Sequence, residues 1–234
     1  MKRRPLVMAA FVLVVFAAAS TNARALPRDD KPSHELPFEQ VAGDNGDYDT
    51  LPGDWPPAGT YRVLVDVTNQ VLTVYRTDDG QVVRQCLCST GTTKTPTPPG
   101  TFQMQGKRRR FSIFTGYESA GYGQYMTKIN DKSWFHSIIY KKKDAATYTV
   151  SYKNLGTRQS HGCIRLPVPD ARWIYFNLAP GSEVTVTGKL PRDKALRESL
   201  KLPPVPKVRL KNLSNVPQIF AEGGENVGTA KSSD

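Results

Sequence analysis

Apolar and β-branched residues alternate with polar ones over a central stretch of the chain, about residues 59–189. Short turn sequences divide this stretch, and most pieces between them have the period of two that is typical of β-strands. The first three pieces are joined by tight turns, which predicts an antiparallel meander. The strands expected from this pattern lie at residues 61–67, 71–75, 81–88, 101–105, 127–129, 134–140, 147–152 and 182–187.

Within this stretch one segment has a clear helical pattern, at residues 171–178. Asp170 precedes it and can accept hydrogen bonds from the free N–H groups of the first turn, while Pro180 and Gly181 end it. The expected fold class is therefore mostly β, a distorted barrel or sandwich with one short helix packed against it.

The N-terminal flank has the composition of an export signal followed by a linker. Residues 1–25 combine Lys2, Arg3 and Arg4 with an apolar run and a small-x-small site, which predicts a secretory signal peptide. An uncleaved anchor is the alternative, although the apolar run is shorter than the roughly 20 residues of a spanning helix. Residues 26–58 are polar and rich in Asp, Gly and Pro, and a flexible leader is expected there.

The C-terminal flank, residues 190–234, is expected to be a tail that contains Pro and Gly. One or two helical turns are possible near residues 193–200, and the prolines at 203–206 favour an extended segment. Beyond the N-terminal run no stretch of this chain is apolar enough to cross a bilayer, so we expect a secreted or cell-envelope protein.

The formal net charge is +11, and loss of the four cations in the predicted signal, which carries no acids, leaves +7. A basic exported protein meets anionic polymers, so wall polymers are candidate partners. The sequence has no nucleic-acid-binding motif, no cofactor motif and no signal of an oligomeric state. Two basic runs, residues 107–110 and 141–143, are expected to be solvated surface turns rather than binding patches.

Three cysteines are too few for a disulfide scaffold, and the odd count leaves at least one thiol unpaired within the chain. Cys86 and Cys88 share one face of a predicted strand at a separation that is awkward for a mutual disulfide, so two buried thiols are expected. Cys163 therefore needs another explanation.

Cys163 lies in the stretch Ser160-His161-Gly162-Cys163-Ile164-Arg165. An imidazole near a thiol can take its proton, and the backbone N–H groups of Gly162 and Cys163 could face a developing oxyanion. Arg165 shares the face of Cys163 in an extended segment and could hold a substrate carboxylate. The alternatives are a buried structural cysteine beside a core histidine, or a metal site built from Cys86, Cys88, His161 and Cys163, whose spacing fits no usual zinc pattern.

A nucleophilic cysteine often takes its base from a histidine distant in sequence, and His136 is the natural candidate because His34 lies in the leader. Ser137 follows His136 directly and could fix its ring through the backbone or the hydroxyl group.

These residues resemble the signature of the L,D-transpeptidase catalytic domain (YkuD-type) family, a histidine, a spacer and then Ser/Thr-His-Gly-Cys. The similarity extends to the Ser-Thr-Gly and Pro-rich loop at residues 89–102 and to the final helix and strand, in all about residues 60–187. It implies Cys163 as nucleophile, His136 as general base oriented by Ser137, and Ser160, His161 and Gly162 as residues that shape the oxyanion site. Arg165 and Tyr125 are implied to contact substrate.

The resemblance also implies the reaction. Cys163 would attack the third residue of a peptidoglycan tetrapeptide stem, release D-alanine, and pass the acyl group to an amine of a neighbouring stem to form a 3→3 cross-link. No cofactor is implied, and carbapenems would acylate the same cysteine. Two other functions stay open: hydrolysis by the same site, as an L,D-carboxypeptidase, and a non-catalytic cell-wall-binding module.

Overall fold

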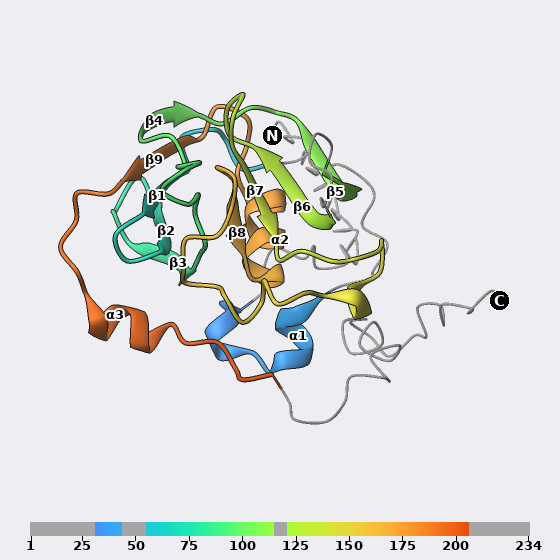
Figure 1. Ribbon diagram of the computed structural model, residues 1–234. Coiled ribbons are helices and arrows are strands. Elements are labelled where there is room, and N and C mark those ends of the chain that lie inside the picture. The colour runs from blue at the N-terminus through green and yellow to red at the C-terminus, as the bar shows by residue number, and fades with distance from the viewer. Residues whose placement is uncertain (1–30, 44–54, 115–120, 206–234) are drawn as a thin grey trace, which may run out of the picture.

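The computed structural model describes residues 31–43, 55–114 and 121–205, which build two β-sheets around a buried helix (Figure 1). The first sheet has the strand order β3-β2-β1-β9-β4, with β1 and β9 parallel and the other neighbours antiparallel. Its strands are β1 (Tyr61–Asp66), β2 (Val71–Arg76), β3 (Val82–Leu87), β4 (Gly100–Gln103) and β9 (Glu183–Thr187).

The second sheet has the order β5-β6-β7-β8, with β7 and β8 parallel. Its strands are β5 (Arg108–Ile113), β6 (Tyr122–Lys128), β7 (Trp134–Ser137) and β8 (Ile164–Leu166). The helices of the described residues are the 3-10 turns η1 (Ser33–Glu35) and η2 (Ala145–Thr147), and α1 (Phe38–Ala42), α2 (Val168–Asn177) and α3 (Lys194–Ser199). The predicted mostly-β fold class is confirmed.

The β1–β2 hairpin shows how local sequence specifies a turn. Asp66 Oδ1 accepts hydrogen bonds from the backbone N–H of Thr68 at 2.9 Å and of Asn69 at 3.1 Å. An aspartate at this position closes a turn because its side chain imitates a backbone carbonyl. The strands on both sides then pair from Tyr61 opposite Arg76 to Asp66 opposite Val71, as the alternating pattern predicted.

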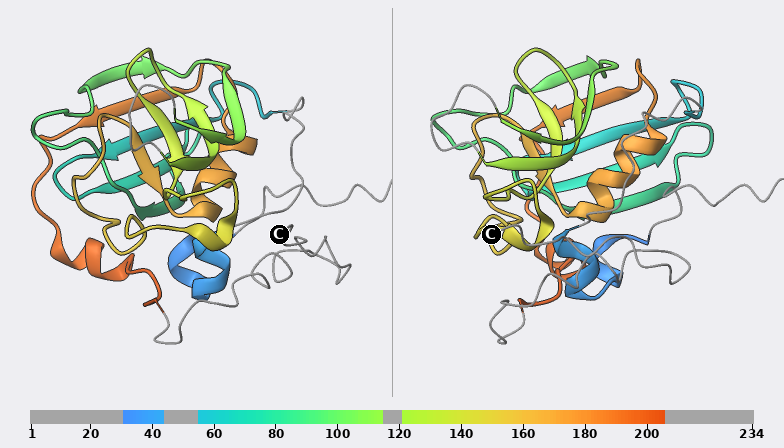
Figure 2. Two further views of the ribbon diagram at one scale, coloured as in Figure 1. Left: turned by 45° about the vertical axis from the view of Figure 1, so that its right-hand side comes forward. Right: turned by 90° about the vertical axis from the view of Figure 1, so that its right-hand side faces the viewer.

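Helix α2 fills the centre of the molecule, and all ten of its residues are buried. It lies against β6, β7 and β8 on one side, and its Trp173 ring packs edge-on against Tyr61 of β1 with centroids 5.3 Å apart. Figure 2 shows the helix from two further directions, next to the strands of both sheets. A helix enclosed in this way is apolar or internally paired all round.

Asp170 does not cap α2, in contrast to the sequence expectation. The helix begins earlier, at Val168, and its N-cap position makes no side-chain hydrogen bond. The fully buried Asp170 carboxylate instead accepts a hydrogen bond from Arg84 Nε at 2.7 Å and another from Ser33 Oγ. Burial of a carboxylate requires such partners, and they come from β3 and from the N-terminal segment.

The basic run at residues 107–110 is not the exposed turn that the sequence predicted. It enters strand β5, and the side chains of Arg108 and Arg110 are buried. Arg108 lies over the Trp55 ring at 5.1 Å, and Arg110 over the Tyr125 ring at 4.1 Å. Guanidinium groups stack on aromatic faces, which makes their burial possible. The other run, residues 141–143, is exposed as expected.

Two other strand predictions were wrong in part. The strand expected at residues 134–140 ends at Ser137, and residues 147–152 form turns with one isolated bridge between Tyr140 and Tyr148. The aromatic residues of these two segments pack in the core instead of forming strands, since Tyr140 and Tyr152 are buried there.

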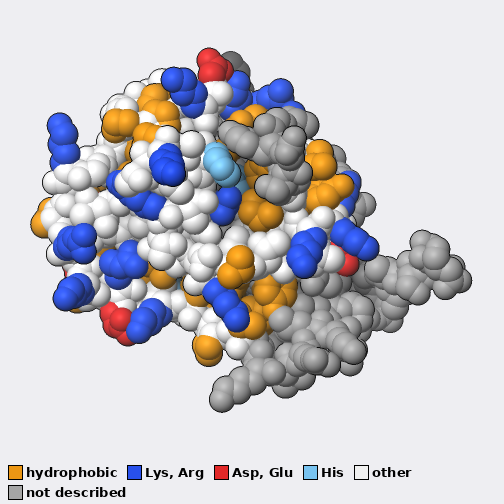
Figure 3. Space-filling view, in the orientation of Figure 1, with side chains coloured by type: hydrophobic (Ala, Val, Ile, Leu, Met, Phe, Trp, Pro, Cys, Tyr) orange, Lys and Arg blue, Asp and Glu red, His pale blue; other side chains and the backbone are white. Residues whose placement is uncertain are grey.

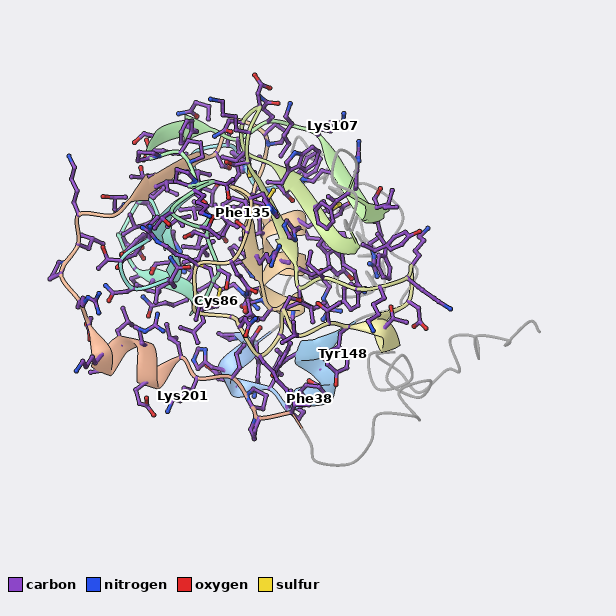
Figure 4. All side chains as sticks on the ribbon, in the orientation of Figure 1. Phe38, Cys86, Lys107, Phe135, Tyr148 and Lys201 are labelled. Atoms are coloured by element: carbon purple, nitrogen blue, oxygen red, sulfur yellow. The ribbon has the colours of Figure 1, made fainter. Side chains whose placement is uncertain are left out.

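The expected flexible leader is ordered over residues 31–43. Phe38 of α1 packs edge-on against Tyr148 and Tyr152, with ring centroids 5.7 and 5.0 Å apart, and Figure 4 shows Phe38 and Tyr148 close together. The Tyr140 hydroxyl donates to the carbonyl of Ala42 at 2.9 Å. The segment between β7 and β8 therefore supplies the apolar partners that the leader lacks by itself.

The first part of the predicted C-terminal tail also packs on the domain. Helix α3 forms where one or two helical turns were expected, and Arg197 donates to the backbone carbonyls of Asn69 and Gly156, the latter at 3.0 Å. Leu200 is buried, and the Tyr152 hydroxyl donates to the carbonyl of Pro203 at 2.8 Å. Residues 190–205 thus form an arm, from here on the C-terminal arm, that crosses the surface beside β3.

No helix within the described ranges is long and apolar enough to span a membrane. The predicted signal peptide, residues 1–25, lies outside those ranges.

Candidate active site

The parallel pair β7–β8 places the predicted catalytic residues on one face of the second sheet. His136 lies opposite Arg165, and Phe135 lies opposite Ile164. Side chains alternate along a strand, so His136, Arg165 and Cys163 share one face while Phe135 and Ile164 point into the core. Figure 4 labels Phe135 at the centre of the molecule. Two segments that are far apart in the sequence thereby meet at the predicted nucleophile and base.

A loop after β3 holds the other edge of the Cys163 segment. Ser89 exchanges two backbone hydrogen bonds with Arg165, both 2.8 Å long, and the carbonyl of Thr90 accepts the backbone N–H of Ser160 at 3.1 Å. Gly91 is required there, because a Cβ at this position would lie 2.1 Å from the carbonyl oxygen of Thr95. This loop contains the Ser-Thr-Gly motif of the sequence, and its backbone hydrogen bonds hold the segment that carries the Cys163 thiol in place.

Two hydrogen bonds of the Ser160 hydroxyl group fix the conformation of the turn before Cys163. Its hydroxyl donates to the Cys163 carbonyl at 2.5 Å and accepts the Gly162 N–H at 3.2 Å. Gly162 has φ +115°, a backbone conformation that residues with a Cβ rarely adopt. In this arrangement the Gly162 N–H is bonded within the turn, so an oxyanion at this N–H would have to replace the Ser160 hydroxyl group as its acceptor.

The His136 imidazole has a fixed orientation and a strongly buried position. Its Nδ1 lies 2.6 Å from the carbonyl oxygen of Ser137, which is an acceptor, so Nδ1 carries the proton and Nε2 is left as the free base. Burial, with a smaller effect from the positive charge of Arg165, lowers the pKa of His136 to about 3. The imidazole is therefore neutral at physiological pH.

Ser137 fixes the ring through its backbone, one of the two routes that the sequence left open. Its hydroxyl is used elsewhere: it accepts the backbone N–H of Gln124 at 2.8 Å and donates to the carbonyl of Ile138 at 2.8 Å. These two bonds anchor the end of β7 to β6, and the anchored backbone presents the Ser137 carbonyl to His136.

Cys163 is half-buried and its thiol is free. Burial raises the pKa of the Cys163 thiol, while a hydrogen bond from the Trp134 backbone and the charge of Arg165 act in the opposite direction. Since the imidazole pKa is lowered and the thiol pKa is raised, the resting pair is a neutral thiol beside a neutral base. That state suits a general base that takes the proton as the thiol attacks.

Arg165 supplies the positive charge of the site. Its Nε is buried and has no hydrogen-bond partner within the part of the chain that the structure describes. A buried guanidinium donor without a partner is costly unless an acceptor arrives, and a carboxylate is the acceptor that fits its planar geometry. Arg165 is therefore available for an anionic group of a ligand.

Tyr125 does not line the site. Its ring is fully buried between Arg110 and the rings of Tyr175 and Phe176 on α2. Its φ of +49° is unusual for a residue with a large side chain. The substrate contact that the family resemblance implied for Tyr125 is therefore wrong, because the strand turns this side chain into the core. His161, in contrast, is exposed on the surface beside Cys163.

Three residues of the site escaped the sequence analysis: Trp134, Phe114 and Gly123. The Phe114 ring packs edge-on against the His136 imidazole with centroids 4.6 Å apart, and Gly123 lies beneath both rings. A glycine inside a strand signals close approach of another group. The Gly121-Tyr122-Gly123 sequence was therefore the available signal.

The metal alternative has no support in the site geometry. Cys86 and Cys88 are buried and free, as predicted, and burial raises the pKa of both thiols. No group of three or more potential metal ligands gathers in residues 31–43, 55–114 and 121–205. The four residues of the proposed metal site therefore form no such group.

Most of the charged side chains on the face of the molecule in Figure 3 are Lys or Arg, and few acidic side chains are visible there. A histidine side chain is visible on the same face, among Lys, Arg and hydrophobic side chains. One exposed cation next to the Cys163 segment is Lys132, whose carbonyl oxygen would lie 3.5 Å from a Cβ on Gly162.

The fold brings a histidine on β7 and a cysteine just before β8 to the same end of one sheet, an arrangement that cysteine enzymes use. The L,D-transpeptidase catalytic domain (YkuD) family matches residues 60–186, more than half of the chain. The chain is 30% identical over 138 residues to the Bacillus subtilis (strain 168) protein named "Putative L,D-transpeptidase YciB", an alignment that covers 58% of this chain and 71% of that protein. The protein belongs to the L,D-transpeptidase catalytic domain family.

Solved structures show a weaker likeness. An L,D-transpeptidase from Mycobacterium smegmatis is 23% identical with a TM-score of 0.45, over 55% of this chain and 59% of that one. A Clostridium acetobutylicum protein, described as a fused Zn-dependent amidase, peptidase and peptidoglycan-binding domain-containing protein, is 26% identical with a TM-score of 0.43, over 58% of this chain and 55% of that one. The chain thus spans less than two thirds of each of these solved chains.

Proposed function

We propose that the protein is an L,D-transpeptidase that forms 3→3 peptidoglycan cross-links through a thioester on Cys163 and releases D-alanine. The observation that carries the proposal is the shared face of β7 and β8, where a half-buried thiol, a neutral imidazole and an unpartnered guanidinium donor lie together. A binding module needs no such combination of nucleophile and base. Members of the family act on peptidoglycan peptides, so the proposal places the protein in the cell envelope.

In the acylation step, Cys163 Sγ attacks the carbonyl carbon of the third stem residue while His136 Nε2 takes the thiol proton. The new bond is a thioester, the broken bond is the amide to D-alanine, and His136 returns the proton to the leaving amine. Arg165 holds a carboxylate of the donor stem. His161 and the backbone around Cys163 shape the space for the tetrahedral oxyanion.

In the second step, a side-chain amine of a neighbouring stem attacks the thioester. The amide bond forms, the carbon–sulfur bond breaks, and the proton of the amine passes through His136 to the departing thiolate. No cofactor takes part in either step, and anionic wall polymers are further candidate partners of the basic surface. A carbapenem is expected to acylate Cys163, because it presents a strained carbonyl to the same nucleophile.

The test incubates the purified protein with a tetrapeptide-stem muropeptide and follows the products by mass spectrometry. A cross-linked dimer that has lost one D-alanine supports the proposal, provided that Cys163→Ala abolishes it and the buried-thiol variant Cys88→Ala does not. A shortened monomer without dimer would instead indicate an L,D-carboxypeptidase. Binding to intact wall with neither product would indicate a wall-binding module.

A further inference from the structure

Phe114 and Gly123 form a compact arrangement around one side of the His136 imidazole. The Phe114 and His136 rings lie at 61° with centroids 4.6 Å apart. A Cβ built on Gly123 would lie 2.7 Å from Phe114 Cζ and 3.5 Å from His136 Nδ1. Phe114 can therefore occupy its place only because residue 123 has no side chain.

The atoms that meet here are those of the hydrogen bond that orients the base. Nδ1 of His136 donates to the Ser137 carbonyl at 2.6 Å, and this same nitrogen is the His136 atom that lies 3.5 Å from a Cβ built on Gly123. A hydrogen bond covered by apolar atoms is stronger than one that water can reach. The cover of Phe114 thus protects the bond that fixes the ring orientation and the neutral tautomer in which Nδ1 carries the proton and Nε2 is free.

We propose that Phe114 is a positioning residue, which acts through His136 by sealing the Nδ1–H···O=C bond from water, and that Gly123 provides the space for it. This inference rests on the proposed function for its consequence in catalysis, but its structural part concerns the imidazole alone. In a chain without this cover, water competes for Nδ1–H and hydrates the charged imidazolium, so the ring loses its fixed orientation.

The charged and titratable groups around the imidazole, within the part of the chain that the structure describes, are few. Arg165 lies opposite it on β8 and Cys163 belongs to the segment before β8, whereas Phe114, which follows β5, and Gly123 of β6 carry no charge. Loss of the apolar cover therefore leaves Arg165 as the one charge that opposes protonation, and hydration of the ring then raises the imidazole pKa from its lowered value.

The experiment is an NMR titration of the imidazole nitrogens in the full chain, between pH 5 and 8, on the wild type and Phe114→Ala. The wild-type His136 signal is expected to stay unchanged over this range, and the variant signal is expected to titrate. Gly123→Ala, which pushes the ring out from the other side, is expected to behave like Phe114→Ala, and Phe114→Leu to retain the wild-type signal. Ile113→Ala, at an exposed position next to Phe114, is the matched control.

A double variant gives the sharpest outcome. If the two residues act through one contact, Phe114→Ala with Gly123→Ala is no worse than Phe114→Ala alone, and additive effects would overturn the proposal. In turnover, kcat is expected to fall roughly three- to tenfold with KM little changed, because one positioned base supplies a larger factor than this. The inference is wrong if His136 fails to titrate in both single variants, or if Ile113→Ala changes it equally.

The NMR result does not depend on turnover. If the wild type forms no product with any stem peptide while His136 titrates only in the variants, the proposed function fails and the positioning role of Phe114 stands. If the wild type cross-links stems and the variants neither titrate nor slow, the positioning role fails and the proposed function stands.

Discussion

His136 lies directly opposite Arg165 across the parallel β7–β8 pair, so that a permanent cation sits beside a buried imidazole. Burial and this charge hold the pKa of His136 at about 3, well below its ordinary 6.5. Each proton that reaches this imidazole must overcome both effects. In the unfolded chain His136 is neither buried nor held next to Arg165, so its pKa is higher there than in the folded protein. This difference in pKa makes the free energy of unfolding depend on pH.

The first prediction concerns that dependence. Between pH 6.5 and pH 5 the unfolded imidazole binds a proton and the folded one does not, so stability falls as pH falls. The free energy of unfolding is expected to drop by roughly 1.5 kcal/mol over this range from His136 alone. Urea denaturation at the two pH values measures it. In His136→Gln the drop should be smaller by that amount, and an unchanged drop would contradict the prediction.

The second prediction concerns the enclosed ion pair between Arg84 and Asp170, whose side chains are 1% and 0% exposed. Asp170→Ala leaves the guanidinium buried without its carboxylate, and the expected loss of stability is roughly 3–5 kcal/mol. Adding Arg84→Met to this variant should recover part of the loss, because the unpaired charge is then gone. Thermal or urea unfolding checks both, and Asp78→Ala, at an exposed turn, serves as the control.

The third prediction concerns the C-terminal arm. Arg197→Ala removes the hydrogen bonds to the carbonyls of Asn69 and Gly156, with an expected loss of about 2 kcal/mol for a charged donor. Lys194→Ala, on an exposed position of the same helix, should change stability by less than about 0.5 kcal/mol. Limited proteolysis should cleave the arm faster in Arg197→Ala only, and equal cleavage in both variants would argue against the anchoring role.

The fourth prediction concerns the turn before the thiol. Gly162 has φ +115°, so Gly162→Ala strains the backbone by roughly 1–3 kcal/mol, and the turn relaxes by giving up the Ser160 bonds. Acylation of Cys163 by a carbapenem, followed by mass spectrometry, is expected to slow at least about tenfold. Gly188→Ala, whose nearest neighbour would lie 3.9 Å from the new Cβ, should react at the wild-type rate.

The sequence by itself determined the meander β1–β2–β3 and which two residues are the candidates for nucleophile and base. Strand alternation and the Asp66 turn depend on near neighbours, and local sequence contains all of them. The motif around Cys163 and the lone suitable histidine, His136, needed only residue types and spacing. The buried state of Cys86 and Cys88 followed in the same way, because a thiol on a strand face of apolar residues has little reason to be exposed.

Tertiary structure decided the places where a side chain finds its partner far along the chain. Arg108 and Arg110 are buried because rings from other segments cover them. The local sequence of β5 shows only the run of charges, which predicts an exposed turn. Asp170 does not cap helix α2, because its carboxylate accepts hydrogen bonds from Arg84 and Ser33 in the interior. Such partners lie outside the local sequence, and charge or polarity alone does not reveal them.

The same reason explains the terminal segments and the cover of the base. Residues 31–43 have too little apolar surface to fold alone, but Phe38 packs on Tyr148 and Tyr152 once residues 138–157 are in place. Phe114 reaches His136 only through the pairing of β5, β6 and β7. The sequence determined which groups can react, and long-range packing decided which of them are buried, oriented and shielded from water.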